Sequence, residues 1–297
     1  MAAGAHRAQG RIGQPHFWLT SEGVFGVALG VSTSFIFLFV LFGALLEKAG
    51  AGNYFIQLAF ALLGQFRGGP AKAGVVSSGM TGMISGSSVA NVVTTGTFTI
   101  PLMKRVGYTA VQAGAIECAA GVNGQLMPPV MGAAAFLMAE YVGITYADVV
   151  RHAFLPAIIT YGALFYIVDI EAAKKGMRGL PRTRRRSVAQ GALKALLAFC
   201  GFVIMAGFIY WGLGWTKRAF GDSASFVALA VVVAGYVALV ANRARHPDLP
   251  LDDPDSALVN VPDFYEVART GLHYLLPVTV LIWCLMVEEM SPGLAAF

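Results

Sequence analysis

The stretch Ser85-Gly86-Ser87-Ser88-Val89-Ala90-Asn91 lies inside a long uncharged segment, residues 73–103. Each glycine costs a helix about 1 kcal/mol relative to alanine, so this segment is a poor continuous helix. Two half-helices that meet at a polar tip, a re-entrant hairpin, account for it better. Irregular backbone at membrane depth is tolerated only where it is buried in protein or lines a water-filled cavity. The segment therefore predicts a hairpin and a cavity.

The next segment, residues 110–142, repeats this pattern around Asn123-Gly124-Gln125-Leu126-Met127-Pro128-Pro129. Two adjacent prolines cannot both sit inside an unbroken helix, because each lacks an N–H and clashes with the preceding turn. We therefore expect a broken helix, with its break near the middle of the membrane. A simple proline kink is the alternative, but two interrupted segments in succession are typical of a transporter site.

The composition excludes most soluble protein classes. Only 12% of the 297 residues are charged and 57% are hydrophobic, whereas a soluble domain carries about 25% charged residues. The sequence predicts an all-α integral membrane protein, a multi-span helical bundle in contact with the lipid bilayer. The net charge of +5 does not indicate nucleic-acid binding, because the basic residues cluster at the ends of apolar runs, where they set membrane orientation.

A membrane span needs about 20 mostly apolar residues. After a polar N-terminal tail, residues 1–20, the first span is predicted at residues 24–46. Residues 54–66 are too few to cross upright, so they either lie in the interface or form one arm of a bent helix. Further spans are expected at residues 154–170, 188–213, 226–241 and 272–287. The basic residues between Lys174 and Arg186 place that loop in the cytoplasm.

Hydroxyl, amide and glycine-freed carbonyl groups gather at the predicted hairpin tip. The candidate substrate- and ion-binding residues there are Ser85, Gly86, Ser87, Ser88, Asn91, Thr94 and Thr95. Such hard oxygen ligands suit Na⁺, and half-helix N-termini suit a carboxylate. The alternative is that small hydroxyl residues only hold helices together.

The break in the second segment supplies the remaining candidate residues. They are Asn123, Gly124, Gln125, Pro128 and Pro129. A helix broken ahead of prolines frees carbonyl groups that can coordinate a cation. We expect Na⁺ at Ser85, Ser87, Asn91 and Gly124.

Glu117 is a carboxylate within an apolar segment, which makes it a functional candidate. It is either a proton or cation ligand, or it lies nearer the interface and pairs with Lys104 or Arg105. Enzyme signatures are absent: the chain has no P-loop, and Ser85 to Ser88 do not form G-x-S-x-G. We expect no catalytic residues, no enzyme activity and no cofactor.

At these motifs the chain resembles the large membrane subunit of tripartite ATP-independent periplasmic (TRAP) transporters. The resemblance rests on Gly69-Pro70-Ala71-Lys72, Ser85-Gly86-Ser87, Ala90-Asn91-Val92-Val93-Thr94-Thr95-Gly96 and Ile100-Pro101-Leu102-Met103. Gln125-Leu126-Met127-Pro128-Pro129-Val130-Met131-Gly132-Ala133-Ala134-Ala135-Phe136 looks specifically like the TAXI branch, whose permeases are often fused. The match covers residues 23–180 and continues weakly to Phe297.

The resemblance implies an elevator-type secondary transporter in the bacterial inner membrane, built from two inverted repeats. It implies Na⁺ as the coupling ion and an organic acid or amino acid as the solute. The implied partners are a periplasmic solute-binding protein and a small membrane subunit, separate or fused. Ser85 to Ser88 and Asn91 correspond to the first hairpin tip, and Gly124 to Pro129 to the first broken helix.

Two departures from the family pattern are visible. Gly121-Val122-Asn123 stands where the family commonly has Ser-Thr-Gly, and no second hairpin or Pro-Pro break follows Arg182. We therefore expect residues 21–180 to form the first transport repeat and residues 181–297 to hold further spans, ending before a second repeat. The missing second half is then a further partner. The alternative is a truncated, non-transporting remnant or an assembly half.

Overall fold

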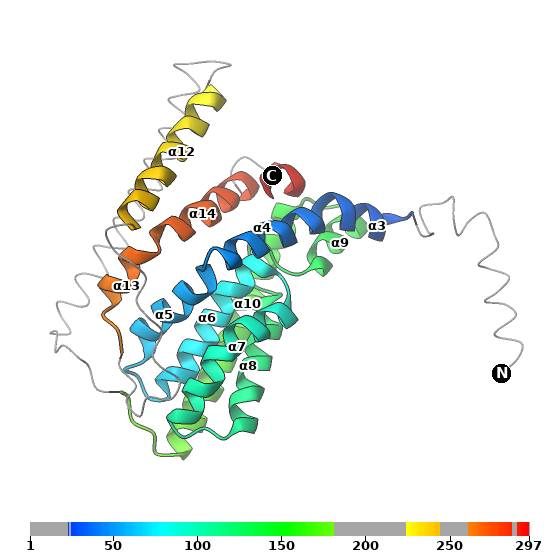
Figure 1. Ribbon diagram of the computed structural model, residues 1–297. Coiled ribbons are helices and arrows are strands. Elements are labelled where there is room, and N and C mark those ends of the chain that lie inside the picture. The colour runs from blue at the N-terminus through cyan, green and yellow to red at the C-terminus, as the bar shows by residue number, and fades with distance from the viewer. Residues whose placement is uncertain (1–22, 24, 181–223, 244–260, 287–289, 297) are drawn as a thin grey trace, which may run out of the picture.

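The computed structural model describes residues 23, 25–180, 224–243, 261–286 and 290–296 (Figure 1). These residues form helices joined by short turns, and no strand occurs among them, so the predicted all-α fold is confirmed. Within them, two helical stretches are long and apolar enough to cross a membrane, Val27–Lys48 and Tyr146–Lys174. The predicted polar tail (1–20) and the predicted span at residues 188–213 lie outside the described residues.

The first predicted span is present as one continuous apolar run of helix. It consists of α3 (Val27–Val31), a π-helical turn η1 (Ser32–Ile36) and α4 (Phe37–Lys48). Gly50, in the left-handed conformation with φ 107°, then redirects the chain into α5 (Ala51–Leu63). Most of α5 is buried against its neighbours, so packing inside the protein accounts for the short apolar stretch at residues 54–66.

The predicted hairpin forms from α6 (Gly69–Ser85) and α7 (Ser88–Arg105), which pack against each other. Its arms reach slightly further than residues 73–103, because Pro70 sits in the first turn of α6, where its missing N–H breaks no helical hydrogen bond. The break falls at Gly86 and Ser87, as expected. The Ser87 hydroxyl caps α7 by accepting a hydrogen bond from Ala90 N at 3.3 Å.

The predicted broken helix consists of α8 (Ala110–Gly124) and α9 (Ala133–Val142). A capping box between Thr109 and Gln112 starts α8. The intervening turn contains a cis peptide bond between Pro128 and Pro129. Because α8 packs on both α6 and α7, the three helices form one compact unit (Figure 1).

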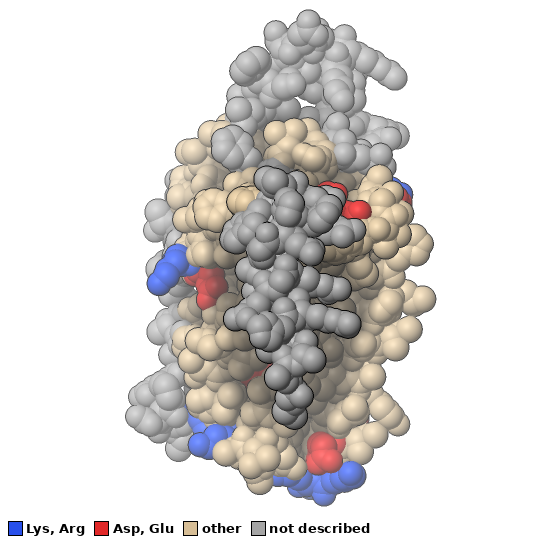
Figure 2. Space-filling view, turned by 90° about the vertical axis from the view of Figure 1, so that its right-hand side faces the viewer, with Lys and Arg blue, Asp and Glu red and all other residues tan. Residues whose placement is uncertain are grey.

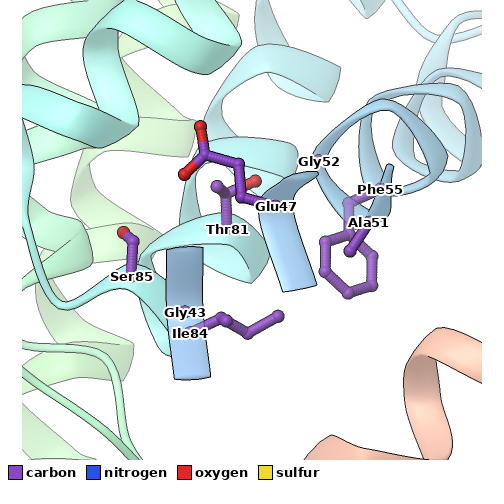
Figure 3. A pocket seen from close by; sticks show the side chains of 8 residues that line it. All are labelled: Gly43, Glu47, Ala51, Gly52, Phe55, Thr81, Ile84 and Ser85. Carbon is purple, nitrogen blue, oxygen red and sulfur yellow. The ribbon is translucent and has the colours of Figure 1, made fainter. Parts of the chain in front are cut away.

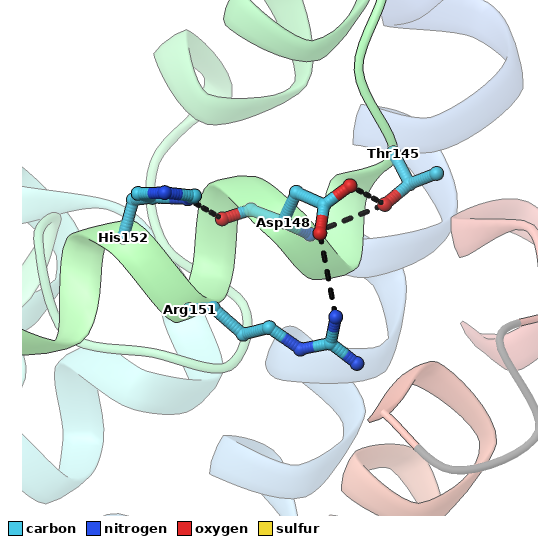
Figure 4. A network of polar contacts seen from close by, with 4 residues as sticks. All are labelled: Thr145, Asp148, Arg151 and His152. Atoms are coloured by element: carbon cyan, nitrogen blue, oxygen red, sulfur yellow. Dashed lines mark hydrogen bonds and ion pairs between the residues drawn. The ribbon is translucent and has the colours of Figure 1, made fainter.

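The longest helix is α10 (Tyr146–Lys174), which exceeds the predicted span of residues 154–170 at both ends. Thr145 caps its start, and Asp148 accepts hydrogen bonds from the Thr145 hydroxyl at 2.6 Å and from Arg151 at 3.3 Å (Figure 4). Such capping in the first turn satisfies backbone N–H groups that have no partner within the helix.

The remaining helices follow at the C-terminal side of the chain. They are α12 (Ala224–Arg243), α13 (Phe264–Thr270), α14 (Leu272–Met286) and α15 (Pro292–Ala296). The pair α13 and α14 is bent by 66°. Gly271 lies at this bend, and a side chain there would collide with the ring of Tyr54 on α5.

The surface of the described residues is largely apolar. Figure 2 shows one face on which most of this surface is uncharged and several charged side chains gather at the lower end. Large apolar side chains stand exposed on α4 and α10, at Phe37, Val40, Leu45, Leu155, Ile159 and Tyr166. Apolar surface of this extent is expected where a protein faces lipid or another membrane subunit.

Candidate functional site

The tip of the hairpin lies directly against the break of the broken helix. A side chain on Gly86 would collide with the carbonyl oxygen of Met131, so the two backbones touch there. The side-chain amide of Gln125 donates a hydrogen bond to the Ser88 hydroxyl at 3.1 Å. The structure thus brings the candidate residues of the hairpin tip next to those of the helix break, which lie about 40 positions further along the sequence.

The region where the hairpin tip meets the break of the broken helix is called the crossing below. Asn91 lies buried at its centre. Its side chain is fully buried, and its amide nitrogen donates to the carbonyl oxygen and the hydroxyl of Ser78 at 2.8 and 3.0 Å. The side-chain oxygen Oδ1 has no hydrogen-bond partner in the described part of the chain. A buried oxygen without a partner costs about 1–3 kcal/mol, which a bound cation or water can offset.

Gly124 allows the helices to approach at this point. A Cβ on Gly124 would lie 2.7 Å from the Asn91 side-chain nitrogen, and a Cβ on Gly82 of α6 would lie 2.5 Å from the Gly124 Cα. Both distances are too short for a real side chain. Glycine is therefore required at Gly82 and Gly124 for α6, α7 and α8 to meet around Asn91.

The carbonyl groups of the break are only partly freed. The Gln125 carbonyl accepts from Gly132 N at 2.8 Å, and the Gly124 carbonyl accepts from Met127 N at 3.2 Å. The hydroxyl of Tyr146 donates to the carbonyl of Pro129 at 2.9 Å and also to that of Val130. The break is thus a folded turn held by α10. Pro128 and Pro129 are buried in it, and Asn123 is half-buried at the end of α8.

Thr94 and Thr95 do not join the hairpin tip. They lie further along α7, where the Thr94 hydroxyl donates to Glu47 on α4 and the Thr95 hydroxyl donates to Glu117 on α8. The rise of the helix explains this separation, because Thr94 and Thr95 lie about 10 Å along the axis from the start of α7, and the turn of about 100° between them directs the two hydroxyls to different helices. Of the candidate residues on α7, Ser88 and Asn91 remain at the crossing.

Glu117 lies within the protein and not at its surface. It is fully buried between α7 and α8, where the hydroxyls of Thr95 and Thr99 both donate to its carboxylate, Thr99 at 2.5 Å. The alternative of a place nearer the interface, paired with Lys104 or Arg105, is therefore wrong, and the role of a proton or cation ligand stays a prediction.

Glu47 is a further polar residue near the hairpin, which the sequence analysis did not name as a candidate because it directly follows the first predicted span. Its carboxylate faces the hairpin. The sequence indicates this position only through the spacing of four residues between Gly43 and Glu47, which places both on the same helix face.

Among the described residues, no group of three or more His, Cys, Asp or Glu side chains could hold a metal ion. A cation site among these residues would therefore combine hydroxyl, amide or carbonyl oxygens with at most two carboxylates.

The sequence of the chain is similar to those of known proteins of one family. Residues 13–249 match the family model described as tripartite ATP-independent periplasmic transporter, DctM component. The C4-dicarboxylate TRAP transporter large permease protein DctM of Pseudomonas aeruginosa is 32% identical over 208 residues, 69% of this chain and 46% of that protein. The protein of the same name from Vibrio cholerae is 29% identical over 238 residues, 79% of this chain and 49% of that protein.

A third relative is the isethionate TRAP transporter permease protein DctMQ of Oleidesulfovibrio alaskensis, 29% identical over 176 residues, 59% of this chain and 27% of that protein. These relatives are transporter permease components and not enzymes, as the missing catalytic motifs predicted. The chain spans about half the length of the DctM relatives it matches, 46% and 49%. It belongs to the family of large membrane permease subunits, the DctM components, of tripartite ATP-independent periplasmic transporters.

Proposed function

We propose that this chain forms part of the permease of a Na⁺-coupled secondary transporter that takes up organic acids or amino acids. The observation that carries the proposal is the crossing of hairpin tip and helix break, where the buried Asn91 Oδ1, beside Gly124, has no hydrogen-bond partner among the residues that the structure describes. An amide oxygen can only accept a hydrogen bond or bind a cation. A small cation can therefore bind to the Asn91 Oδ1 directly, whereas a second acceptor group cannot.

In this proposal the two sides of the crossing have different roles. Asn91 and Gly124 hold Na⁺ on the buried side, together with Ser85 and Ser87 from the tip. Ser88 and Gln125 are more exposed and already bonded to each other, so they face the solute. The N-terminus of α7 points its free N–H groups to the tip, which suits the carboxylate of an organic acid or amino acid.

The proposed setting is the bacterial inner membrane, with an elevator-type movement of the repeat formed by residues 21–180. A periplasmic solute-binding protein would deliver the solute. A small membrane subunit, separate or fused, would brace the permease, and one relative is a DctMQ permease protein. The rest of a large subunit, in the same chain or another, would supply the second repeat. The motif from Gln125 to Phe136 favours the TAXI branch.

A second candidate function is a remnant or assembly half that inserts into the membrane and transports nothing. The observation in its favour is that the carbonyl oxygens of Gly124 and Gln125 at the break already accept backbone hydrogen bonds, at 3.2 and 2.8 Å, which makes them less available to a cation. The two candidates differ in one measurable property, which is Na⁺-dependent solute uptake.

The test is uptake into proteoliposomes that contain the chain, the rest of a large subunit, the small subunit and the binding protein. Labelled succinate and glutamate serve as probes, with an inward Na⁺ gradient compared with a choline gradient. We expect Na⁺-dependent uptake that Asn91→Ala reduces at least tenfold, whereas Thr97→Val, an exposed hydroxyl on the same helix, leaves it unchanged. Uptake that is independent of Na⁺, or unchanged in Asn91→Ala, would sink the Na⁺ assignment; no uptake of any solute supports the remnant.

A further inference from the structure

A small cavity lies between α4, the start of α5 and the C-terminal end of α6 (Figure 3). The volume of the cavity is about 10 Å³, close to the minimum that holds one water or one small ion. Its lining residues are Gly43, Glu47, Ala51, Gly52, Phe55, Thr81, Ile84 and Ser85.

Glycine lets α4 approach the hairpin closely enough to form this cavity. A Cβ on Gly43 would lie 2.8 Å from the Ile84 carbonyl oxygen, so any larger residue would push the two helices apart. Glu47 follows Gly43 by one helical turn, and Ser85 follows Thr81 by one turn. Each pair therefore shares one helix face, and the two faces meet with the carboxylate and the hydroxyls on the same cavity (Figure 3).

Thr81 carries a buried hydroxyl oxygen that none of the described residues pairs with. The residue is 5% exposed, and its hydroxyl has no hydrogen-bond partner in the described part of the chain. A threonine in a helix commonly donates to the carbonyl four residues earlier, and Thr95 and Thr99 on α7 do so at 2.8 and 3.0 Å. Thr81 lacks this bond, which leaves its hydroxyl oxygen available to an occupant of the cavity.

Glu47 supplies the only charge in the cavity lining. One carboxylate oxygen accepts a hydrogen bond from the Thr94 hydroxyl. No further bond to this carboxylate is present among the described residues, so the other oxygen remains available. The Glu47 residue is only partly exposed, and a partner of opposite charge offsets the cost of taking its carboxylate out of water.

We propose that this cavity is a second cation site, which binds one Na⁺ ion through the Glu47 carboxylate and the hydroxyl oxygens of Thr81 and Ser85. One carboxylate with neutral oxygens balances a single positive charge, whereas Ca²⁺ takes six to eight oxygen ligands, commonly with several carboxylates. The small volume favours Na⁺ over the larger K⁺. Occupation would tie the first span to the hairpin at the point where the hairpin begins to turn.

The site is distinct from the crossing around Asn91, and it goes beyond the function proposed above. Glu47 and Thr81 belong neither to the hairpin tip nor to the helix break, although Ser85 lies at the edge of both sites. Na⁺ binding at this cavity requires no solute and no other subunit, so it can be measured on the full chain alone.

The experiment measures the thermal unfolding and ²²Na⁺ binding of the full 297-residue chain in detergent, with Na⁺ replacing choline at constant ionic strength. A ligand that binds only the folded state raises the midpoint of unfolding in proportion to ln(1 + [L]/Kd). Glu47→Gln keeps the shape and removes the charge. Thr81→Val keeps the shape and removes the hydroxyl. The matched controls are Glu140→Gln and Thr97→Val, whose side chains are exposed and away from the cavity.

We expect wild type and both controls to bind Na⁺ with a saturable rise of the midpoint, and Glu47→Gln and Thr81→Val to need at least tenfold more Na⁺ for the same rise. Retention of wild-type Na⁺ affinity in both cavity variants would overturn this site.

If Asn91→Ala alone then removed the response, the crossing would be the cation site and the cavity would hold water only. If the wild type showed no Na⁺ response, both sites would be rejected. If Glu47→Gln did not fold, Thr81→Val would decide.

Discussion

At the scale of a single residue, buried Glu117 and the two threonines that donate to it depend on each other unequally for their hydrogen bonds. The Thr95 and Thr99 hydroxyls donate to its carboxylate, but each also lies within hydrogen-bond distance of the carbonyl four residues earlier. The threonines therefore keep a partner if the carboxylate is removed. The carboxylate, in contrast, depends on the threonines, because it is fully buried.

This asymmetry leads to a test by combined substitution. Thr95→Val with Thr99→Val strands a buried carboxylate, and we expect a loss of about 2–5 kcal/mol of stability. Adding Glu117→Leu should restore most of it, since the stranded group is then gone. Reversible unfolding in detergent measures the difference, with Thr97→Val as the control. Failure of Glu117→Leu to restore stability would show that the carboxylate contributes in another way.

At the scale of the element, Gly86 combines two demands on the hairpin tip. Its φ of 59° lies in the left-handed region, and a side chain there would also collide with the Met131 carbonyl of the break. Gly143, at the end of α9, has φ 72° but nothing within 4 Å of a Cβ. The two glycines thus share the backbone requirement, and only Gly86 carries the steric one.

Alanine substitution at both positions separates these demands. Gly143→Ala should cost about 1 kcal/mol from the left-handed backbone alone. Gly86→Ala should cost about 1–3 kcal/mol more, because the tip must move away from the break. The midpoint of thermal unfolding of each variant measures the two costs. Equal losses would mean that tip and break can separate freely.

At the scale of the whole molecule, an ionic group joins the start of the hairpin to the end of α10. Asp169 accepts from Lys72 and from Arg67, both at 2.5 Å. The Lys72 side chain is 7% exposed, whereas that of Arg67 is 47% exposed. Lys72 therefore depends on Asp169, since removal of the carboxylate would leave a buried ammonium group with no opposite charge.

We accordingly expect Asp169→Asn to lower the midpoint of unfolding, because it leaves the buried Lys72 ammonium without the carboxylate that it contacts. Lys72→Met should cost less, because Arg67 still neutralises Asp169. Glu171→Gln removes the same charge two residues further along α10, where the Lys174 partner is 66% exposed, and should change stability by less than about 1 kcal/mol. Unfolding midpoints in detergent measure all three, and equal effects of Asp169→Asn and Glu171→Gln would contradict the asymmetry.

The local pattern of residues was sufficient to predict the class and the breaks. Length of apolar runs predicts helices that can cross a membrane, and the positions of Gly86 and of Pro128-Pro129 predict where helices stop, because backbone conformation depends on nearest neighbours. Among the described residues, the two breaks and the spans at residues 24–46 and 154–170 are confirmed. The run predicted at residues 272–287 forms the 15-residue α14, which reaches spanning length only together with α13 across a 66° bend. Helix ends shifted by a few residues, since capping by Thr145 or a proline in the first turn extends a helix beyond its apolar core.

The partners of the polar side chains could not be read from the chain alone. Thr94 and Thr95 belong to the same motif as Asn91, yet they face Glu47 and Glu117, because rotation along α7 and the placement of α4 and α8 decide what each touches. Asn91 and Gly124 meet only because Gly82 lets α6 approach α8. Contacts between residues far apart in the chain depend on how helices pack, and packing is a property of the assembled fold.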